Sequence, residues 1–590
     1  MADKMAGQTE TKKPRKASFD AYDSRPWSKY YAGATKPDIA IQYRNLGDLV
    51  THASREYATS PAFTTCFPNG TTGTLTFAEV DRMTDEFAAY LRLELGLQKG
   101  DRVAIQSPNC LAYPIFLFGA AKAGCVIVNI NPLYTAPEIE FALNDSGAKL
   151  VLMIDMFADK LATVVPKSQV QTVLINSVAE FFPPVSKLLI RTVQKLKKMI
   201  PACPVPSMSF TRALALGAKQ LASGKRLPND VGLDDLLALQ YTGGTTGRPK
   251  GAMLTHANLV ANIEQSFNNV VGRLEENRTS LTPLPMYHIF ALGVGGVVYR
   301  AGGHNILIPS PRPVSNLKPA FEKFDIAFMT GVNTLFIGLL NEEWFRTNPP
   351  KNLKTTIGGG TAVQDAVAER WKQVTGYRLY QGYGLSETSP SVTSNPADGP
   401  EKIGSIGIPF ASTYVRIVDE QGNPAPVGAE GELIVKGPQV MRGYWQRPDE
   451  SAMVLKDGWL YTGDIARMDE DGFFYIVDRK KDMVIVSGFN VYPNEVEDAI
   501  VKHPGVLEAG VIGVPDEATG EAVRAYVVRK DPSLNEEALR EHCRKYLAAY
   551  KIPKQIIFRP ELPKTPVGKV LRKDLRAEAL KELSNTSAAM

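Results

Sequence analysis

The sequence contains few cysteines, and none of them lies in a metal-binding pattern. Five cysteines occur among 590 residues, an odd number, and no two form a CxxC pair. This usage argues against a disulfide framework and against a Cys-rich zinc site. It fits a protein of the reducing cytoplasm.

The sequence also has no long apolar run. The opening MADKMAGQTETKKPRKASFD lacks the apolar centre of a signal peptide, and residues 111–121, among the most apolar, stop well short of a bilayer span. We therefore expect neither secretion nor insertion into a membrane.

Neither sign of charge dominates the chain. The 67 basic and 62 acidic residues give a net charge of +5, too small to indicate a nucleic-acid partner. The excess is concentrated in residues 185–200, VSKLLIRTVQKLKKMI, which hold no acidic residue. Their basic residues are Lys187, Arg191, Lys195, Lys197 and Lys198.

Apolar residues in this segment recur every three or four positions, which predicts an amphipathic helix between Pro184 and Pro201. Such a helix can bind the anionic inner face of the cell membrane as a peripheral contact. It can equally pack its apolar face on the protein's own core. The sequence leaves both alternatives open, and it leaves a homodimer open as well.

Several catalytic motifs are missing. The chain has no GxSxG, HExxH or GxGxxG sequence, and its six histidines are scattered. These absences argue against a covalent hydrolase, a zinc protease and a dinucleotide-binding enzyme.

Two patterns of organisation are present instead. Apolar runs and helical patterns alternate from about residue 43 to 475, and a compact pattern of strands and helices follows. We predict an α/β fold in which a tail at residues 1–40 precedes a large domain of several subdomains, with layered sheets and helices, at residues 41–477. A small α+β domain at residues 478–590 completes the chain.

Residues 241–252, YTGGTTGRPKGA, are rich in glycine and hydroxyl side chains and contain a lysine. Glycines let backbone N–H groups converge on phosphate oxygens, and the lysine adds a positive charge. Pro249 before Lys250 excludes a Walker A loop. The candidate phosphate-binding residues are Tyr241, Thr242, Gly243, Gly244, Thr245, Thr246, Gly247, Arg248, Pro249, Lys250, Gly251 and Ala252.

This string resembles the phosphate loop of the adenylate-forming (AMP-binding) superfamily, which includes acyl-CoA synthetases, firefly luciferases and peptide-synthetase adenylation domains. Further segments resemble the superfamily's motifs in the same order: QGYGLSET at 381–388, GWLYTGDIA at 458–466, FFYIVDRKKDMVIVSGFNVYPNEVE at 473–497 and PKTPVGK at 563–569. The resemblance extends from about residue 43 to 576.

The resemblance implies ATP, Mg²⁺ and coenzyme A as ligands, and it assigns roles to residues. Tyr383 would stack on adenine, Glu387 would hold Mg²⁺, and Asp464 and Arg479 would bind the ribose. His288 would lie at the acyl pocket. The remaining nucleotide positions are Gly359, Gly360, Gly382, Gly384 and Ser386.

The same resemblance implies two half-reactions and a mobile C-terminal domain. Lys569 would stabilise the approach of a carboxylate to the α-phosphate. The small domain would then rotate about Lys481, because the Lys569 loop occupies the path of the thiolate. Ser487, Gly488 and Phe489 would reach the pantetheine path after that rotation.

The substrate is expected to have an uncharged tail, because PLPMYHIFALGVGGVVY at 284–300 contains no acidic residue. The small and apolar residues 291–296 are candidates for lining an acyl tunnel, and the alternative for most of them is a buried helix. DRKKDM and TGVNTLF resemble the bacterial long-chain fatty-acid–CoA ligases, which implies activation of long-chain fatty acids for β-oxidation and lipid metabolism. A medium-chain or aryl-acid ligase and a non-enzymatic fatty-acid carrier are the alternatives.

Overall fold

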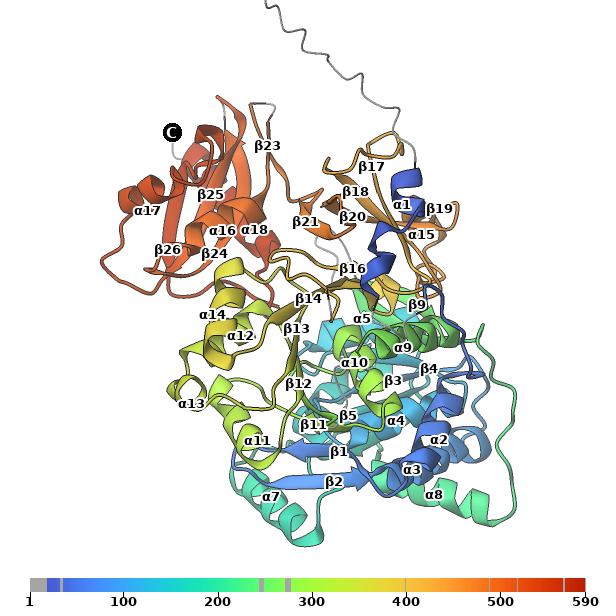
Figure 1. Cartoon of the computed structure of the whole chain (residues 1–590). Coiled ribbons are helices and arrows are strands. Elements are labelled where there is room, and N and C mark those ends of the chain that lie inside the picture. Colours follow the sequence, from blue (N-terminus) through green and yellow to red (C-terminus); the bar gives the residue numbers. More distant parts are fainter. Residues whose placement is uncertain are drawn as a thin grey trace, which may run out of the picture.

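The computed structural model describes residues 19–31, 36–242, 249–270, 277–397, 399–487, 489–516, 518–565 and 568–588. Residues before about 480 form a large body of three sheets, and the rest form a smaller domain at one end of it (Figure 1). This arrangement confirms the predicted α/β fold.

The first large sheet is parallel except at one edge. Its strand order is β7-β6-β5-β3-β4-β8-β9, and only β9 runs antiparallel to its neighbour. The strands are β3 (Arg102–Gln106), β4 (Val126–Ile130), β5 (Leu150–Ile154), β6 (Thr172–Asn176), β7 (Met208–Ser209), β8 (Leu236–Thr242) and β9 (Lys250–Thr255). Helices α4 (Ala112–Lys122), α5 (Ala136–Ser146), α6 (Leu161–Val164), α7 (Pro184–Leu196) and α8 (Phe210–Ala222) connect them.

The second sheet has the order β16-β15-β14-β13-β12-β10-β11-β1-β2. Its strands are β1 (Pro61–Cys66), β2 (Thr72–Thr76), β10 (Thr279–Thr282), β11 (His304–Leu307), β12 (Phe328–Gly331), β13 (Thr355–Gly358), β14 (Leu379–Gly384), β15 (Ser391–Ser394) and β16 (Ile408–Pro409). The associated helices are α2 (Leu46–Glu56), α3 (Phe77–Ala89), α9 (His256–Val270), α10 (Ile289–Arg300), α11 (Lys318–Lys323), α12 (Asn333–Asn341), α13 (Glu343–Thr347) and α14 (Asp365–Thr375).

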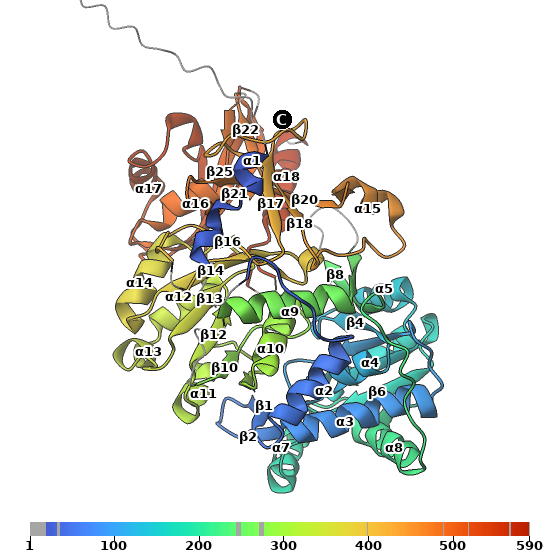
Figure 2. The same ribbon diagram turned by 45° about the vertical axis from the view of Figure 1, so that its right-hand side comes forward.

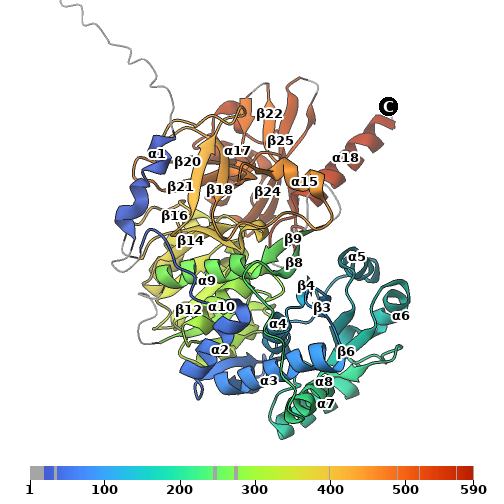
Figure 3. The same cartoon turned by 90° about the vertical axis from the view of Figure 1, so that its right-hand side faces the viewer.

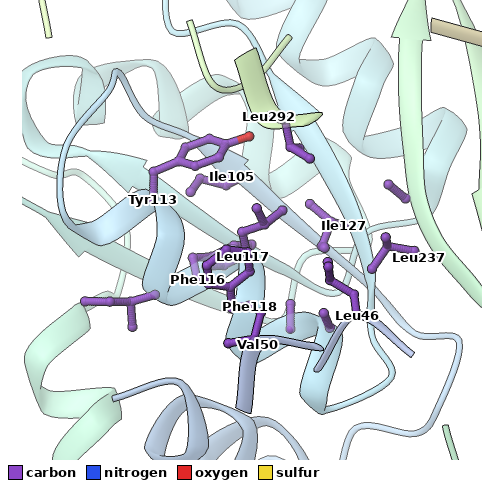
Figure 4. Packing of buried hydrophobic residues seen from close by; sticks show 14 of the residues in the cluster. Leu46, Val50, Ile105, Tyr113, Phe116, Leu117, Phe118, Ile127, Leu237 and Leu292 are labelled. Carbon is purple, nitrogen blue, oxygen red and sulfur yellow. The ribbon is translucent and has the colours of Figure 1, made fainter. Parts of the chain in front are cut away.

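Helices fill the space between these two sheets (Figure 2). Helix α4, AYPIFLFGAAK, is apolar all round, and so it is buried on every side. Figure 4 shows its Phe116, Leu117 and Phe118 packed with side chains of the first sheet and with Leu292 of α10. The largest core of the molecule therefore lies between the two sheets.

A third, smaller sheet carries the chain towards the C-terminal domain. It consists of β17 (Tyr414–Val418), β18 (Gly431–Lys436), β19 (Leu455–Lys456), β20 (Trp459–Met468) and β21 (Phe474–Arg479), and α15 (Pro448–Val454) precedes β19. Helix α1 (Asp20–Asp23) packs on β17, and Tyr22 and Trp27 are buried in the core of this sheet.

The C-terminal domain has its own sheet and its own cores. The sheet comprises β22 (Val484–Val486), β23 (Phe489–Val491), β24 (Val506–Asp516), β25 (Gly520–Arg529) and β26 (Gln555–Arg559), with helices α16 (Pro493–Val501), α17 (Glu536–Cys543) and α18 (Arg572–Ala588). Every buried residue of its two hydrophobic clusters follows residue 483. Each part of the chain thus buries its own apolar surface.

Helix α7 lies at the end of the molecule farthest from the C-terminal domain (Figures 1 and 3). It confirms the helix predicted between Pro184 and Pro201, although it ends at Leu196, and its apolar face does not pack on the core. Val185, Leu188, Leu189 and Leu196 are all exposed. In the part of the chain that the structure describes, no helix is both long and apolar enough to cross a bilayer.

Candidate active site

A cavity of about 790 Å³ brings most of the predicted site residues together. Its walls come from both large sheets, from β20 and β21, and from the C-terminal domain through Thr565 and Lys569. Residues more than 400 positions apart in the sequence, such as Asn129 and Lys569, therefore face one space.

The glycine-rich segment lies between two paired strands. Strand β8 ends at Thr242, the antiparallel β9 begins at Lys250, and α9 follows β9. Tyr241, Thr242 and Lys250 line the cavity, whereas Pro249 and the β9 residues Gly251 and Ala252 are not part of the lining. The predicted phosphate ligands Gly243, Gly244, Thr245, Thr246, Gly247 and Arg248 lie outside the described residues.

Lys250 is held by two neighbours from the segment around α15. Its ammonium pairs with Glu450, and its nitrogen lies 5.2 Å from the centre of the Tyr444 ring. Tyr241 is fixed from the other side, because its hydroxyl donates to Asp145 at 2.8 Å. The positive charge of Lys250 is therefore positioned at the cavity wall by an acidic and an aromatic side chain.

Tyr383, Asp464 and Arg479 form one connected group. The Tyr383 hydroxyl donates to Asp464 Oδ2 at 2.6 Å, and Arg479 Nε lies 3.3 Å from Asp464 Oδ1. Asp464 and Arg479 are partners across β20 and β21, which explains why residues 15 positions apart meet. Burial and the adjacent Asp464 carboxylate raise the pKa of Tyr383 far above its usual value, so its hydroxyl remains a donor.

Glu387 lines the cavity close to this group. Its Oε1 accepts from the Tyr444 hydroxyl at 2.8 Å, and its backbone carbonyl accepts from the N–H of Met441. No cluster of three or more histidine, cysteine or acidic side chains suited to a metal occurs among the described residues. A single carboxylate fits Mg²⁺, which is commonly held by one or two carboxylates, substrate phosphates and water.

The predicted glycines form part of the wall where the backbone comes close. Gly359, Gly360, Gly382 and Gly384 all line the cavity, as does Ser386. A Cβ on Gly384 would lie 1.9 Å from the carbonyl oxygen of Pro390, so no other residue fits there without moving the chain. Gly360 has a φ of +76°, a conformation that favours glycine.

His288 has a structural contact in addition to its place in the cavity wall. Its Nδ1 accepts from the N–H of Phe290 at 3.3 Å, which makes it the N-cap of α10. Burial, with a further contribution from the Lys569 charge, lowers the pKa of His288 to about 4. The imidazole is therefore neutral at pH 7.

Lys569 enters the cavity on a tight turn of the C-terminal domain. Thr565 accepts from the Lys569 N–H at 3.0 Å, and Gly568 has a φ of +87°. A Cβ on Gly568 would lie 2.6 Å from Thr334 Oγ1, so this glycine permits the turn to approach the large body. Burial first, and then the charge of Arg479, lowers the pKa of Lys569 to about 8.

The residues predicted for coenzyme A are separated from this cavity. Lys481 lines it, but Ser487 and Phe489 do not. Phe489 is 57% exposed and packs on Tyr550, with the ring centres 5.0 Å apart, on the C-terminal domain. Gly488 lies outside the described residues.

Most of residues 291–296 follow the second alternative, that of a buried helix. Only Val294 of this segment lines the cavity, because one side of α10 faces the core between the sheets. Leu292 is 3% exposed there, and a Cβ on Gly293 would lie 2.6 Å from Pro390. The apolar wall consists of Val294 together with Phe290, Val297, Phe328, Val332 and Ile357.

Several lining residues were not predicted from the sequence. They include Asn131, Tyr134, Gln240, Thr361, Tyr444 and Thr462. Gln240 and Thr361 each adjoin a predicted residue, and Thr462 lies within the motif at 458–466, so closeness to a motif was the available signal. Tyr444 stands in MRGYW, which carries no chemical pattern, and only its contact with Glu387 reveals it.

The sequence matches the AMP-binding enzyme family over residues 50–445 and the AMP-binding enzyme C-terminal domain over residues 495–569. It is 47% identical to the long-chain-fatty-acid–CoA ligase of Salmonella typhimurium, covering 95% of this chain and 99% of the relative. It is 38% identical to the ligase of the same name from Bacillus subtilis, covering 94% and 98%.

Solved structures of similar fold include ATP-bound MatB from Rhodopseudomonas palustris. Its TM-score is 0.77 at 30% identity, covering 90% of this chain and 99% of that one. The anthranilate CoA ligase AuaEII in complex with anthranoyl-AMP has a TM-score of 0.78 at 25% identity, covering 92% and 99%.

Proposed function

This chain belongs to the family of AMP-binding enzymes, and from that premise we propose that it is an ATP-dependent long-chain fatty-acid–CoA ligase. A fatty acid, ATP and CoA would give acyl-CoA, AMP and diphosphate through an acyl-adenylate. The observation that carries this proposal is one cavity that combines Lys569, the Tyr383–Asp464–Arg479 group and an apolar wall. The ligases of 38–47% identity support the same activity.

The first half-reaction requires little proton transfer, because the fatty acid is already a carboxylate at pH 7. A carboxylate oxygen attacks the α-phosphorus, and the bond to the bridging oxygen breaks to release diphosphate. The Lys569 ammonium relieves the charge crowding between carboxylate and phosphate, and Lys250 faces the phosphates. Mg²⁺, held through Glu387, would neutralise phosphate charge when bound.

The second half-reaction requires the C-terminal domain to move. Lys569 occupies the cavity, while Ser487 and Phe489 lie away from it. We place the hinge at Lys481 and the domain boundary between residues 477 and 478, whereas residues 20–30 of the predicted tail at 1–40 pack on the third sheet. Rotation there would withdraw Lys569 and bring the β22–β23 hairpin to the thiol.

The apolar wall favours a substrate with a hydrocarbon tail, and no acidic side chain of α10 is available to bind an α-ammonium group. The enzyme would act in the cytoplasm, with peripheral contact to the inner face of the cell membrane through residues 185–200, and would supply β-oxidation and lipid metabolism. A homodimer is compatible with this function. An aryl-acid or medium-chain acid remains the second candidate, since AuaEII is an anthranilate CoA ligase.

The test is acid-dependent exchange of labelled diphosphate into ATP, with acetate, octanoate, palmitate, oleate, benzoate and amino acids as substrates. We expect exchange with palmitate and oleate to exceed all the others. Preference for benzoate or octanoate would establish the second candidate instead. Absence of exchange with every acid would contradict the ligase assignment.

A further inference from the structure

Tyr444 lies between two charged residues of the cavity. Its hydroxyl donates to Glu387 Oε1 at 2.8 Å, and the Lys250 nitrogen lies 5.2 Å from the centre of its ring. The three residues all line the cavity, and Tyr444 is buried, with 9% of its surface exposed. One phenol therefore contacts both the carboxylate that is proposed to hold Mg²⁺ and the lysine that is proposed to face the phosphates.

Backbone hydrogen bonds attach the segment around Tyr444 to β9. The Trp445 N–H donates to the Gly251 carbonyl at 2.8 Å, and the Met253 N–H donates to the Gly443 carbonyl at 2.8 Å. Strand β9 begins with the lysine of the phosphate-binding segment. The position of the phenol relative to this lysine is therefore set by strand pairing and does not depend on the side chains alone.

The same segment also holds Glu387 through its backbone. The Met441 N–H donates to the Glu387 carbonyl at 2.8 Å, and Ser451 Oγ accepts from the Tyr444 N–H at 2.8 Å. Glu387 is thus bound both at its main chain and at one carboxylate oxygen by residues that are close together in the sequence. Hydrogen bonds of this kind orient a carboxylate and tune its affinity for a metal ion. A carboxylate that accepts one hydrogen bond keeps further lone pairs for a cation.

We propose that Tyr444 is a positioning residue of the nucleotide site, with separate tasks for its hydroxyl and its ring. The hydroxyl orients the Glu387 carboxylate for Mg²⁺, and the ring holds the Lys250 ammonium at the cavity wall through a cation–π contact. The inference rests on the proposed function, which supplies ATP and Mg²⁺ as ligands. It adds to that function a residue that connects the metal-binding carboxylate to the phosphate-binding lysine.

The test measures ATP binding to the full chain by isothermal titration, once with Mg²⁺ and once with EDTA. Fatty acid and CoA are left out, so that no reaction takes place. Tyr444→Phe removes the hydroxyl and keeps the ring. The gain in ATP affinity that Mg²⁺ gives should fall by about tenfold or more in this variant, because the carboxylate loses its orienting hydrogen bond. Its ATP affinity in EDTA should equal that of the parent protein.

Two further variants separate the ring from the hydroxyl and test the route through the carboxylate. Tyr444→Leu removes both groups, so its ATP affinity in EDTA should also fall, by roughly threefold, because Lys250 loses the cation–π contact. Glu387→Gln should abolish the gain from Mg²⁺. Adding Tyr444→Phe to Glu387→Gln should change ATP binding no further, since the hydroxyl acts only through that carboxylate.

Tyr475→Phe is the matched control. It also removes a phenol that donates to a carboxylate, that of Asp469 at 3.1 Å, and neither residue lines the cavity. This variant should bind ATP like the parent protein in both solutions. A change as large as that of Tyr444→Phe would show that the loss of any such hydrogen bond disturbs the site, and it would overturn the specific role of Tyr444.

Other outcomes distinguish failure of this inference from failure of the proposed function. If Tyr444→Phe kept the full gain from Mg²⁺, or lost ATP affinity equally with Mg²⁺ and with EDTA, the positioning role would be overturned and the ligase assignment would stand. A further loss in the Glu387→Gln background would overturn the route through the carboxylate. A parent protein that binds no ATP with Mg²⁺ would overturn the proposed function, and this inference with it.

Discussion

Lys569 is the residue whose removal separates the two proposed half-reactions. It is supplied by the C-terminal domain and shares the cavity with His288, Asp464 and Arg479. Lys569→Ala should slow adenylate formation by about 10² to 10³, the usual cost of losing one charge-stabilising group. Transfer to CoA from supplied acyl-adenylate should be little changed. Equal loss in both assays would contradict this role.

The pH dependence of the same lysine gives a second test. Its pKa of about 8 means that the ammonium loses its charge as the pH rises through that value. The kcat/KM for ATP, which reports the free enzyme, should therefore fall above pH 8. Lys569→Arg keeps the charge and should move this fall to higher pH. A profile unchanged by Lys569→Arg would show that another group titrates.

His288 should contribute to stability as a helix cap, whatever its contact with substrate. Its Nδ1 accepts from the Phe290 N–H at the start of α10. His288→Ala removes that acceptor and should destabilise the protein by about 1 kcal/mol, whereas His288→Asn replaces it. Thermal unfolding at pH 7 measures the difference. A melting temperature for His288→Asn no higher than that of His288→Ala would refute the cap.

Motif spacing was enough to predict the site residues that lie in short sequence motifs. It was not enough to predict the cavity residues that lie outside such motifs. Tyr383, Glu387, Asp464 and Lys569 stand in short strings of unusual composition, and all four face the cavity. Tyr444 belongs to no such string. Its position depends on how the segment before α15 folds back on β9, a long-range event that local sequence does not encode.

Among the elements, the link between β21 and α18 carries the contacts that a domain rotation must break. Arg572 on α18 contacts Asp478 at 3.2 Å and Glu497 at 2.8 Å, and Asp478 also accepts from the Asn494 N–H. Asp478 precedes Lys481 in the chain, whereas Arg572, Glu497 and Asn494 follow it. Of these contacts, those of Asp478 span the proposed hinge, and the hydrogen bond of 2.8 Å from the Tyr492 hydroxyl to Glu430 spans it as well.

Asp478→Asn should favour the rotated state. Losing one charged hydrogen bond costs about 1.5 kcal/mol, so adenylate formation should slow by roughly tenfold while CoA transfer is maintained. Glu497→Gln is the matched control, because it weakens a contact made wholly after Lys481. It should lower the stability of the C-terminal domain without separating the two half-reactions. Identical kinetics for both variants would argue against a role of the Asp478 contacts in stabilising the unrotated state.

Helices α7 and α10 show that sequence periodicity predicts a helix but not the environment of each of its faces. The pattern predicted α7 and its two faces, but the direction of the apolar face depends on the buried Glu180–Lys187 contact. In α10 the run of small residues resembled a tunnel wall, yet the tight approach of Pro390 explains the glycine at 293. Periodicity predicts that a helix forms, whereas the segments packed against the helix determine which of its faces is buried.

At the scale of the whole molecule, the two parts should unfold separately. Leu539 lies in a C-terminal cluster and Leu143 in a cluster of the first sheet, and both are fully buried. Leu539→Ala should destabilise the C-terminal domain by about 2 to 5 kcal/mol and leave the larger transition in place. Leu143→Ala should do the reverse. Calorimetry in which each substitution shifts every transition equally would contradict independent cores.

The order of the domains and their fold class were predictable, because alternating strands and helices give way to a different pattern after about residue 478. The pairing of the strands was not. The second sheet joins β1 and β2 to strands formed more than 200 residues later, as β1 lies beside β11. Such pairings depend on packing between distant segments.

Among the described residues, no hydrophobic cluster contains residues from both sides of Lys481, so the proposed rotation would not expose a shared apolar core to water. The proposed rotation would exchange ion pairs and hydrogen bonds at the boundary between the two domains, and water can replace each of these interactions. The proposed rotation at each turnover would therefore leave both domains folded.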